Sequence, residues 1–116
     1  MAFVNDLYRA VTDVIILCTL AADDSYGYEI SKRIAAATGG EYEIKDATLY
    51  SAFKKLESDG QIDSYWGSEA TSARRRYYTL TKKGRKEYEK SLAEWLRAKN
   101  AIDILINSDG SAHFEN

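Results

Sequence analysis

Residues 46–62 of the chain, DATLYSAFKKLESDGQI, have the pattern of a short helix with signals at both ends. The Asp46 side chain can accept a backbone N–H in the first turn, and Gly60 tolerates the left-handed conformation that ends many helices. The residues between them include an apolar stripe at helical spacing: Leu49, Ala52, Phe53 and Leu56. The stretch therefore predicts an amphipathic helix that buries this stripe.

The opposite face of this helix carries small residues, hydroxyl groups, one aromatic ring and two cations. It is made of Ala47, Thr48, Tyr50, Ser51, Lys54 and Lys55. Hydroxyls and lysines reach phosphates and base edges in a DNA groove. The face is either a DNA-reading surface or the solvated side of an ordinary amphipathic helix, and the rest of the chain decides between the two.

Length and composition indicate one domain, or one domain with an added helix. The 116 residues are 45% hydrophobic and include no proline, so long helices are not interrupted. The one cysteine, Cys18, excludes an intramolecular disulfide and fits a reducing cytoplasm. We find no secretion signal, and the most apolar stretch, residues 14–22, is too short to span a bilayer. We therefore expect a cytoplasmic protein that does not enter a membrane.

Charge is unevenly distributed along the chain. The net charge is −2, which by itself argues against a nucleic-acid partner. Residues 45–86, however, hold ten basic and five acidic side chains, whereas the segments before and after them carry −4 and −3. Positive charge is concentrated in the segment that begins with the quoted helix, as expected of a DNA-binding surface.

Two more helices are expected before the quoted stretch. Residues 6–22 become apolar on nearly every side, so this helix is either the central core helix of a monomer or is covered by a second subunit or a ligand. Residues 26–38 form the next helix, and residues 41–45 alternate as a very short strand would. Two helices joined by a short connection, the second with a polar outer face, are typical of a helix-turn-helix.

A β-hairpin is expected after the quoted helix, with strands near residues 62–66 and 74–80. Three helices followed by a hairpin are the order of a winged helix-turn-helix domain, so we predict a mainly α (α+β) fold. Arg74, Arg75 and Arg76 stand where the hairpin tip rejoins its second strand. Cations at this place would neutralise DNA phosphates, although the run in isolation is more typical of a solvated charged segment.

Thr81 is a candidate cap for a last helix over residues 82–106. Its seam has heptad spacing and is interrupted by one lysine: Tyr88, Leu92, Trp95, Lys99, Ile102 and Ile106. Such a helix is roughly 35 Å long at 1.5 Å per residue, which is too long for so small a domain to cover. We therefore divide the chain into a winged-helix domain (residues 1–80), a dimerisation helix (81–106) and a disordered tail (107–116).

Three motifs together resemble the PadR family of transcriptional regulators. They are ATLY at 47–50 with KKLE at 54–57, YGYEI at 26–30, and RRRYYTLTKKG at 74–84. The resemblance extends over residues 7–106, and the single C-terminal helix is similar to the small LmrR-like, multidrug-sensing subfamily. It implies a homodimer that binds a palindromic operator and represses a neighbouring transporter or detoxification gene.

The resemblance also implies a hydrophobic cavity at the dimer centre, where a tryptophan stacks on flat lipophilic compounds. The residues that we expect to line it are Leu7, Val11, Val14, Cys18, Leu92, Trp95 and Lys99. Cys18 stands where LmrR-like sequences have an amide, and Lys99 where they have an acid. A lysine there favours anionic or phenolic ligands, so a phenolic-acid-responsive repressor is an alternative. A ligand-independent winged-helix interaction module is another.

The expected DNA contacts come from the quoted helix, the hairpin and the residues before each helix. They are Tyr26, Lys45, Thr48, Tyr50, Ser51, Lys54, Lys55, Arg74, Arg75 and Arg76. Nothing in the sequence indicates an enzyme, a cofactor or a metal. The one histidine, His113, lies in the expected tail, and neither a metal-ligand cluster nor a Gly-rich phosphate loop is present.

Overall fold

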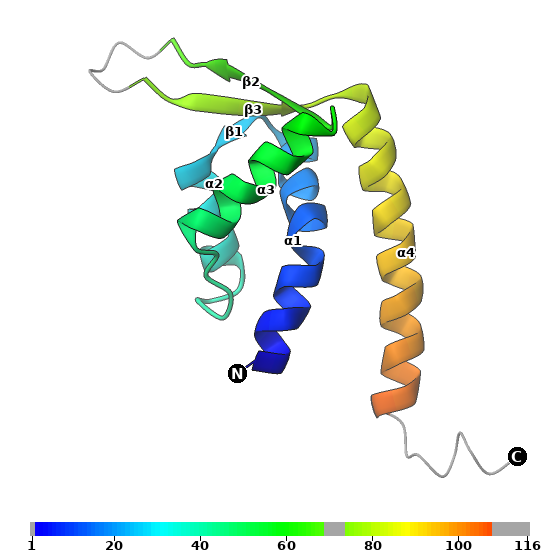
Figure 1. Ribbon diagram of the computed structural model, residues 1–116. Coiled ribbons are helices and arrows are strands. Elements are labelled where there is room, and N and C mark those ends of the chain that lie inside the picture. Colours follow the sequence, from blue (N-terminus) through cyan, green and yellow to red (C-terminus); the bar gives the residue numbers. More distant parts are fainter. Residues whose placement is uncertain (1, 69–73, 108–116) are drawn as a thin grey trace, which may run out of the picture.

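The computed structural model describes residues 2–68 and 74–107, which form a mainly helical domain with a small antiparallel sheet (Figure 1). Its elements, in order, are α1 (Ala2–Ala22), β1 (Ser25–Tyr26), α2 (Gly27–Ala37), α3 (Asp46–Ser58), β2 (Ile62–Trp66), β3 (Arg76–Leu80) and α4 (Lys82–Asn107). This is the predicted winged helix-turn-helix order. The hairpin tip and all of the expected tail except Asn107 lie outside the described residues.

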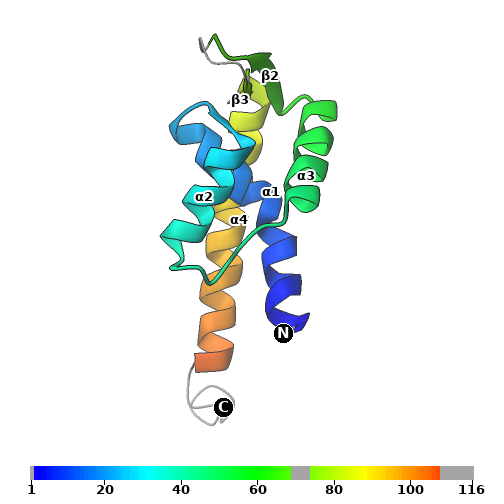
Figure 2. The same ribbon diagram turned by 90° about the vertical axis from the view of Figure 1, so that its left-hand side faces the viewer.

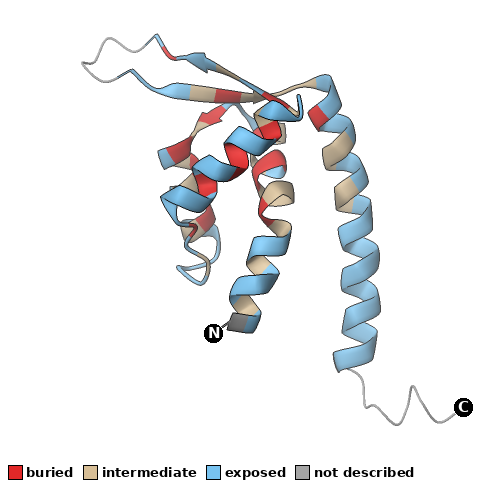
Figure 3. Cartoon of the chain, in the orientation of Figure 1, coloured by how far each residue is buried: buried red, intermediate tan, exposed pale blue. Residues whose placement is uncertain are grey.

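The helix α3 is held by the stripe that its sequence predicts. Leu49, Ala52, Phe53 and Leu56 are all buried. They pack with apolar side chains from the other elements: Ile16, Leu17, Leu20, Ile30, Ile34, Ile44, Ile62 and Tyr78. In Figure 2, α1 lies between α2 and α3, and Figure 3 shows that most buried residues lie on these three helices and on the sheet.

The three strands pair in the order β1-β3-β2. In the hairpin Ser64 lies opposite Tyr78 and Trp66 lies opposite Arg76. Successive side chains alternate between the two faces of a sheet, so these four residues share the face turned toward α3. The opposite face carries three tyrosines in contact: Tyr77 stacks on Tyr65 and meets the Tyr26 ring edge to face.

The short strand expected at residues 41–45 is wrong. These residues form a loop, and the third strand is instead β1, which the sequence presents as part of a polar turn. The alternation at 41–45 has another cause, because Tyr42 and Ile44 are the inward-pointing anchors of the loop. The Tyr42 amide donates to Thr38 Oγ1 at 3.1 Å rather than to a neighbouring strand.

The expected cap at Asp46 is also wrong. Lys45 is the N-cap residue, no side chain caps this end, and Asp46 is the first residue of the helix. Its carboxylate still favours the helix start through the helix dipole. The other two end signals are confirmed, since Gly60 has φ of 75° and the Gly84 amide donates to Thr81 Oγ1 at 3.0 Å.

The helix α4 extends well beyond the part of the chain against which it packs. Its first half packs beside α1, through Tyr88, whereas the side chains of its second half are exposed (Figure 3). Over residues 2–68 and 74–107, no helix combines the length and the apolar character needed to cross a membrane.

Gly84 is buried where α4 leaves the sheet, and a Cβ there would overlap the Gln61 carbonyl oxygen and lie 2.8 Å from Leu80 Cδ1. We expect Gly84→Ala to lower the free energy of unfolding by about 1–3 kcal/mol, because the backbone of Gln61 must shift. Urea unfolding followed by circular dichroism measures this. Lys86→Ala, at an exposed position two residues along α4, is the control and should leave the midpoint nearly unchanged.

Candidate nucleic-acid interface

The outer face of α3 is exposed along its length. Burial of the apolar stripe turns the polar side chains outward: Thr48, Tyr50, Ser51, Lys54 and Lys55 are all exposed, as is Lys45 just before the helix. In Figure 3 exposed residues recur along the whole of α3, between the buried residues of its stripe. The structure therefore places six of the ten predicted DNA contacts on one end and one face of a single helix.

The remaining four lie beside this face, around a groove of about 530 Å³ between α2, α3 and β3. Its lining residues are Tyr26, Gly27, Tyr28, Tyr50, Arg74, Arg75, Arg76 and Tyr78. The groove thus joins the hairpin arginines to Tyr50 on α3 and to the start of α2. Tyr28 is a member that the sequence analysis missed; it is exposed and lies 5.2 Å under the Lys32 ammonium.

The three arginines do not form a uniform charged run. The Arg75 guanidinium lies over the Tyr26 ring at 4.8 Å. Those of Arg74 and Arg76 lie over Trp66 instead, at 5.6 and 5.5 Å. Arg76 also reaches Glu57 on α3 at 3.8 Å. Each guanidinium is therefore held by an aromatic ring, which limits the entropy that it loses when it binds a ligand.

Trp66 was not predicted as part of this surface, although a signal was present. In an antiparallel hairpin, a tryptophan at the end of one strand faces the residue at the start of the next. The register pairs it with Arg76. The sequence suggests the two strands. It does not give the register between them, because the register depends on where each strand begins and ends.

Tyr50 depends on a glycine in α2. A Cβ built on Gly27 would collide with the Tyr50 hydroxyl and lie 2.8 Å from its Cζ. The phenol therefore lies directly over the backbone at the start of α2. This contact sets the distance between α2 and the outer face of α3.

A second groove, of about 410 Å³, separates α3 from α1 and is lined by Arg9, Thr12, Asp13, Ala47, Thr48, Ser51, Ala52 and Lys55. Across it, Lys55 Nζ lies 2.8 Å from Asp13 Oδ2. The hydrogen bond to Asp13, and then the charge of this carboxylate, raise the pKa of Lys55. Lys55 is thus a charged side chain with a partner, whereas the sequence presents it as a solvent-facing cation.

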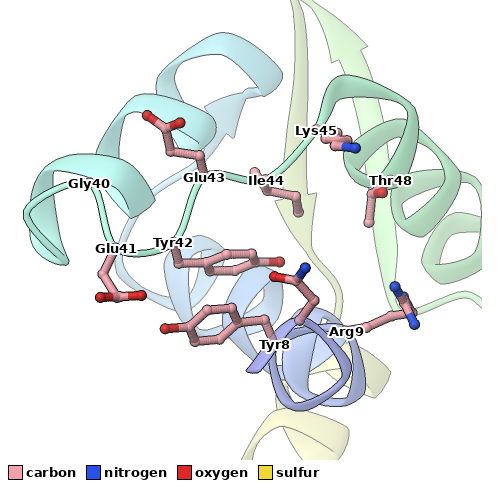
Figure 4. Close-up of a pocket in the computed structure, with 10 residues that line it drawn as sticks. Tyr8, Arg9, Gly40, Glu41, Tyr42, Glu43, Ile44, Lys45 and Thr48 are labelled. Carbon is pink, nitrogen blue, oxygen red and sulfur yellow. The ribbon is translucent and has the colours of Figure 1, made fainter. Parts of the chain in front are cut away.

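The start of α3 is fixed by a polar pocket of about 390 Å³ beside α1 (Figure 4). Tyr8 of α1 stacks on Tyr42 of the loop with ring centres 4.4 Å apart, and the Tyr42 hydroxyl lies 3.0 Å from Thr12 Oγ1. Desolvation, and then the Glu41 carboxylate, raise the pKa of Tyr8 above its ordinary value. These contacts of Tyr42 anchor the loop that leads to Lys45 and Thr48.

The predicted ligand residues are only partly brought together. An apolar groove of about 420 Å³ between α1, α2 and α4 includes Val14, Cys18, Leu92 and Trp95. Leu7, Val11 and Lys99 do not line it, and Lys99 is paired with Asp103 at 3.6 Å. The cation that lines this groove is Arg33, which lies 3.7 Å from Glu29 and 3.8 Å from Asp23.

A model described as the transcriptional regulator PadR-like family matches residues 16–90, from the middle of α1 to the first third of α4. The chain belongs to this family. The match includes α2, α3, the hairpin and the residues directly before both helices, and therefore all ten predicted DNA contacts. The PadR-like family and its solved members are transcriptional regulators, not enzymes.

Solved structures of other regulators have the same fold. A transcriptional regulator from Clostridium thermocellum is 46% identical, with a TM-score of 0.80 over 87% of this chain and 98% of that one. A PadR family regulator from Clostridium difficile is 35% identical, with a TM-score of 0.72 over 83% and 98%. Bacillus subtilis PadR, solved in complex with operator DNA, is 28% identical, with a TM-score of 0.64 over 71% and 46%.

The Gly27–Tyr50 contact can be tested by a double-mutant cycle. We expect Gly27→Ala to lower the free energy of unfolding by about 1–2 kcal/mol, because the new Cβ displaces the phenol. In a Tyr50→Ala background the same change should cost much less, since the space is then empty. Equal costs in the two backgrounds, measured by urea unfolding, would show that Tyr50 does not occupy this place.

Proposed function

We propose that the chain is a homodimeric, DNA-binding transcriptional repressor that senses flat lipophilic or aromatic molecules. In this proposal the outer face of α3 reads an operator and the hairpin arginines bind its backbone. An effector in the groove between α1, α2 and α4 weakens this binding, so that a transporter or detoxification gene is expressed.

The observation that carries the DNA-binding proposal is the geometry around Tyr50. Hydroxyls and lysines suited to base edges lie on α3, and arginines suited to phosphates share one groove with Tyr50 of the same helix. This is the division between reading and anchoring that DNA recognition requires. The operator complex of Bacillus subtilis PadR supports the same role for a related fold.

The dimer proposal rests on the second half of α4. Trp95 is 41% exposed and Ile106 is 69% exposed. Further large apolar side chains on this helix are also exposed: Leu96, Ile102, Ile104 and Leu105. An apolar surface on a helix of 26 residues, which is about 39 Å long, is well explained by pairing with a second copy. Residues 81–106 then act as the dimerisation helix.

The effector proposal rests on the apolar groove that Trp95 and Leu92 of α4 share with Val14 of α1. An exposed indole at its edge offers a flat surface for stacking. Arg33 in the same lining supports a second candidate, a repressor that responds to phenolic acids, because a guanidinium binds carboxylates well. The concentration of basic residues on one surface argues against a ligand-independent protein-binding module.

The wing arginines give the first functional test. We expect Arg75→Ala to weaken binding to every duplex about equally and to reduce the slope of log Kd against log salt by about 1–2 per dimer, since a phosphate contact is lost in each subunit. Arg97→Ala removes the same charge from an exposed site on α4 and is the control. Fluorescence anisotropy at several salt concentrations gives both slopes, and identical slopes would contradict the role of the wing.

Trp95 gives the second test. We expect Trp95→Ala to weaken the binding of a neutral planar aromatic dye roughly tenfold or more, through loss of stacking and of buried apolar area. Trp66→Ala removes the other tryptophan, which lies between Arg74 and Arg76 and away from the groove, and should keep the affinity. Isothermal titration calorimetry compares the three proteins. Equal affinities for wild type and Trp95→Ala would rule out stacking on this residue.

A further inference from the structure

Two adjacent lysines on α3 have different surroundings. Lys54 and Lys55 are both exposed and both lie on the polar side of the helix. Lys55 is hydrogen-bonded to Asp13 of α1 at 2.8 Å. Lys54 takes part in no ion pair within the described residues. Of these two positive charges, one is therefore available to an incoming phosphate and the other already has a carboxylate partner.

Asp13 lies on the side of α1 that is turned toward α3. Its neighbours Ile16, Leu17 and Leu20 are buried in the core, and this orients the preceding turn toward α3. The carboxylate lines the same groove as Thr48 and Ser51, two residues proposed to read DNA. A negative charge at the edge of such a surface repels phosphates. A surface that bound DNA by positive charge alone would bind more tightly without it.

We propose that Asp13 is a specificity-determining residue, which holds Lys55 away from DNA phosphates so that binding depends on base contacts rather than on charge. This inference rests on the proposed DNA binding by α3. It assigns to α1 an indirect part in DNA recognition, through a side chain that acts on Lys55 and does not itself need to contact DNA.

The physical basis is the competition between two anions for one ammonium group. A phosphate that takes Lys55 must displace Asp13 at 2.8 Å and must also approach the freed carboxylate. Non-specific binding consists almost entirely of phosphate contacts, whereas specific binding adds contacts to bases. In the proposal Lys55 stays on Asp13 in the specific complex, where base contacts fix the position of α3. The penalty therefore falls on non-specific complexes, and the ratio between the two affinities rises.

The test compares two duplexes, one selected by the wild-type protein from a random-sequence pool and one with the same bases shuffled. We expect Asp13→Asn to tighten binding to the shuffled duplex roughly three- to tenfold and to steepen its salt slope by about 1–2 per dimer, as one lysine per subunit becomes available. The affinity for the selected duplex should rise less, so discrimination falls. Asp13→Ala should behave in the same way, and thermal unfolding followed by circular dichroism establishes that both variants are folded.

Two controls separate the contact between Asp13 and Lys55, which we call the tether, from a general effect of charge. Asp63→Asn removes one negative charge from an exposed position on β2, next to Ser64, whose hydroxyl bonds Glu57 of α3. Because neighbours in a strand point to opposite faces, Asp63 points away from α3, and its replacement should leave the shuffled-duplex affinity nearly unchanged. In a Lys55→Gln background, Asp13→Asn should lose most of its effect, because the lysine that it would release is absent.

The outcomes are distinct. If Asp13→Asn raises the affinity for the shuffled duplex equally with and without Lys55, or if Asp63→Asn raises it as much, the tether is overturned. DNA binding by the wild type is not affected by that result. A wild-type protein that selects no duplex from the pool would overturn the proposed function, and the role of Asp13 with it. A gain on the shuffled duplex that needs Lys55 supports the proposal.

Discussion

The stack of Phe53 on Tyr78 is the contact on which the candidate interface depends. The two rings are 4.0 Å apart with an interplanar angle of 20°, and both side chains are buried. Phe53 comes from α3 and Tyr78 from β3, so the helix proposed to read bases and the strand that begins at Arg76 share one core. Because protein interiors are packed densely, neither element can move far without the other. The tyrosine and lysines on α3 and the arginines of the hairpin therefore keep their relative positions.

The same constraint explains why polar contacts on the inner face of the sheet matter. Ser64 donates to Glu57 at 2.6 Å, and Arg76 lies 3.8 Å from the same carboxylate. A partly exposed ion pair contributes little to stability by itself. Its effect is geometric, because it holds the Arg76 guanidinium at the junction of helix and hairpin. Arg75, just before β3, lies over Tyr26 instead.

Much of this arrangement could be predicted from local patterns, and the misses have physical causes. The stripe of α3, Gly60 and the cap at Thr81 depend on neighbours within a few residues, and all three are found as predicted. The strand β1 was missed because two residues have no period, and only pairing with Tyr77 and Tyr78 makes them a strand. The partner of Lys55 lies 42 residues away in the chain, and no spacing rule connects positions so distant.

The helix α1 connects the two candidate sites. Asp13 points into the groove beside α3, and the next residue, Val14, lines the apolar groove beside α4. Successive helical positions differ by about 100° in direction, so one turn of α1 contacts both. The core residues Ile16 and Leu17 hold this turn in place.

A molecule that changed the packing of Val14 would therefore act on the same turn of α1 that carries Asp13. It could influence DNA binding by a shift of α1 against α3, through the contact between Asp13 and Lys55, without any change in the fold of the hairpin. Coupling of this kind requires that the effector bind the two positions of α1 with different affinity, since a ligand that binds both equally cannot shift the balance between them.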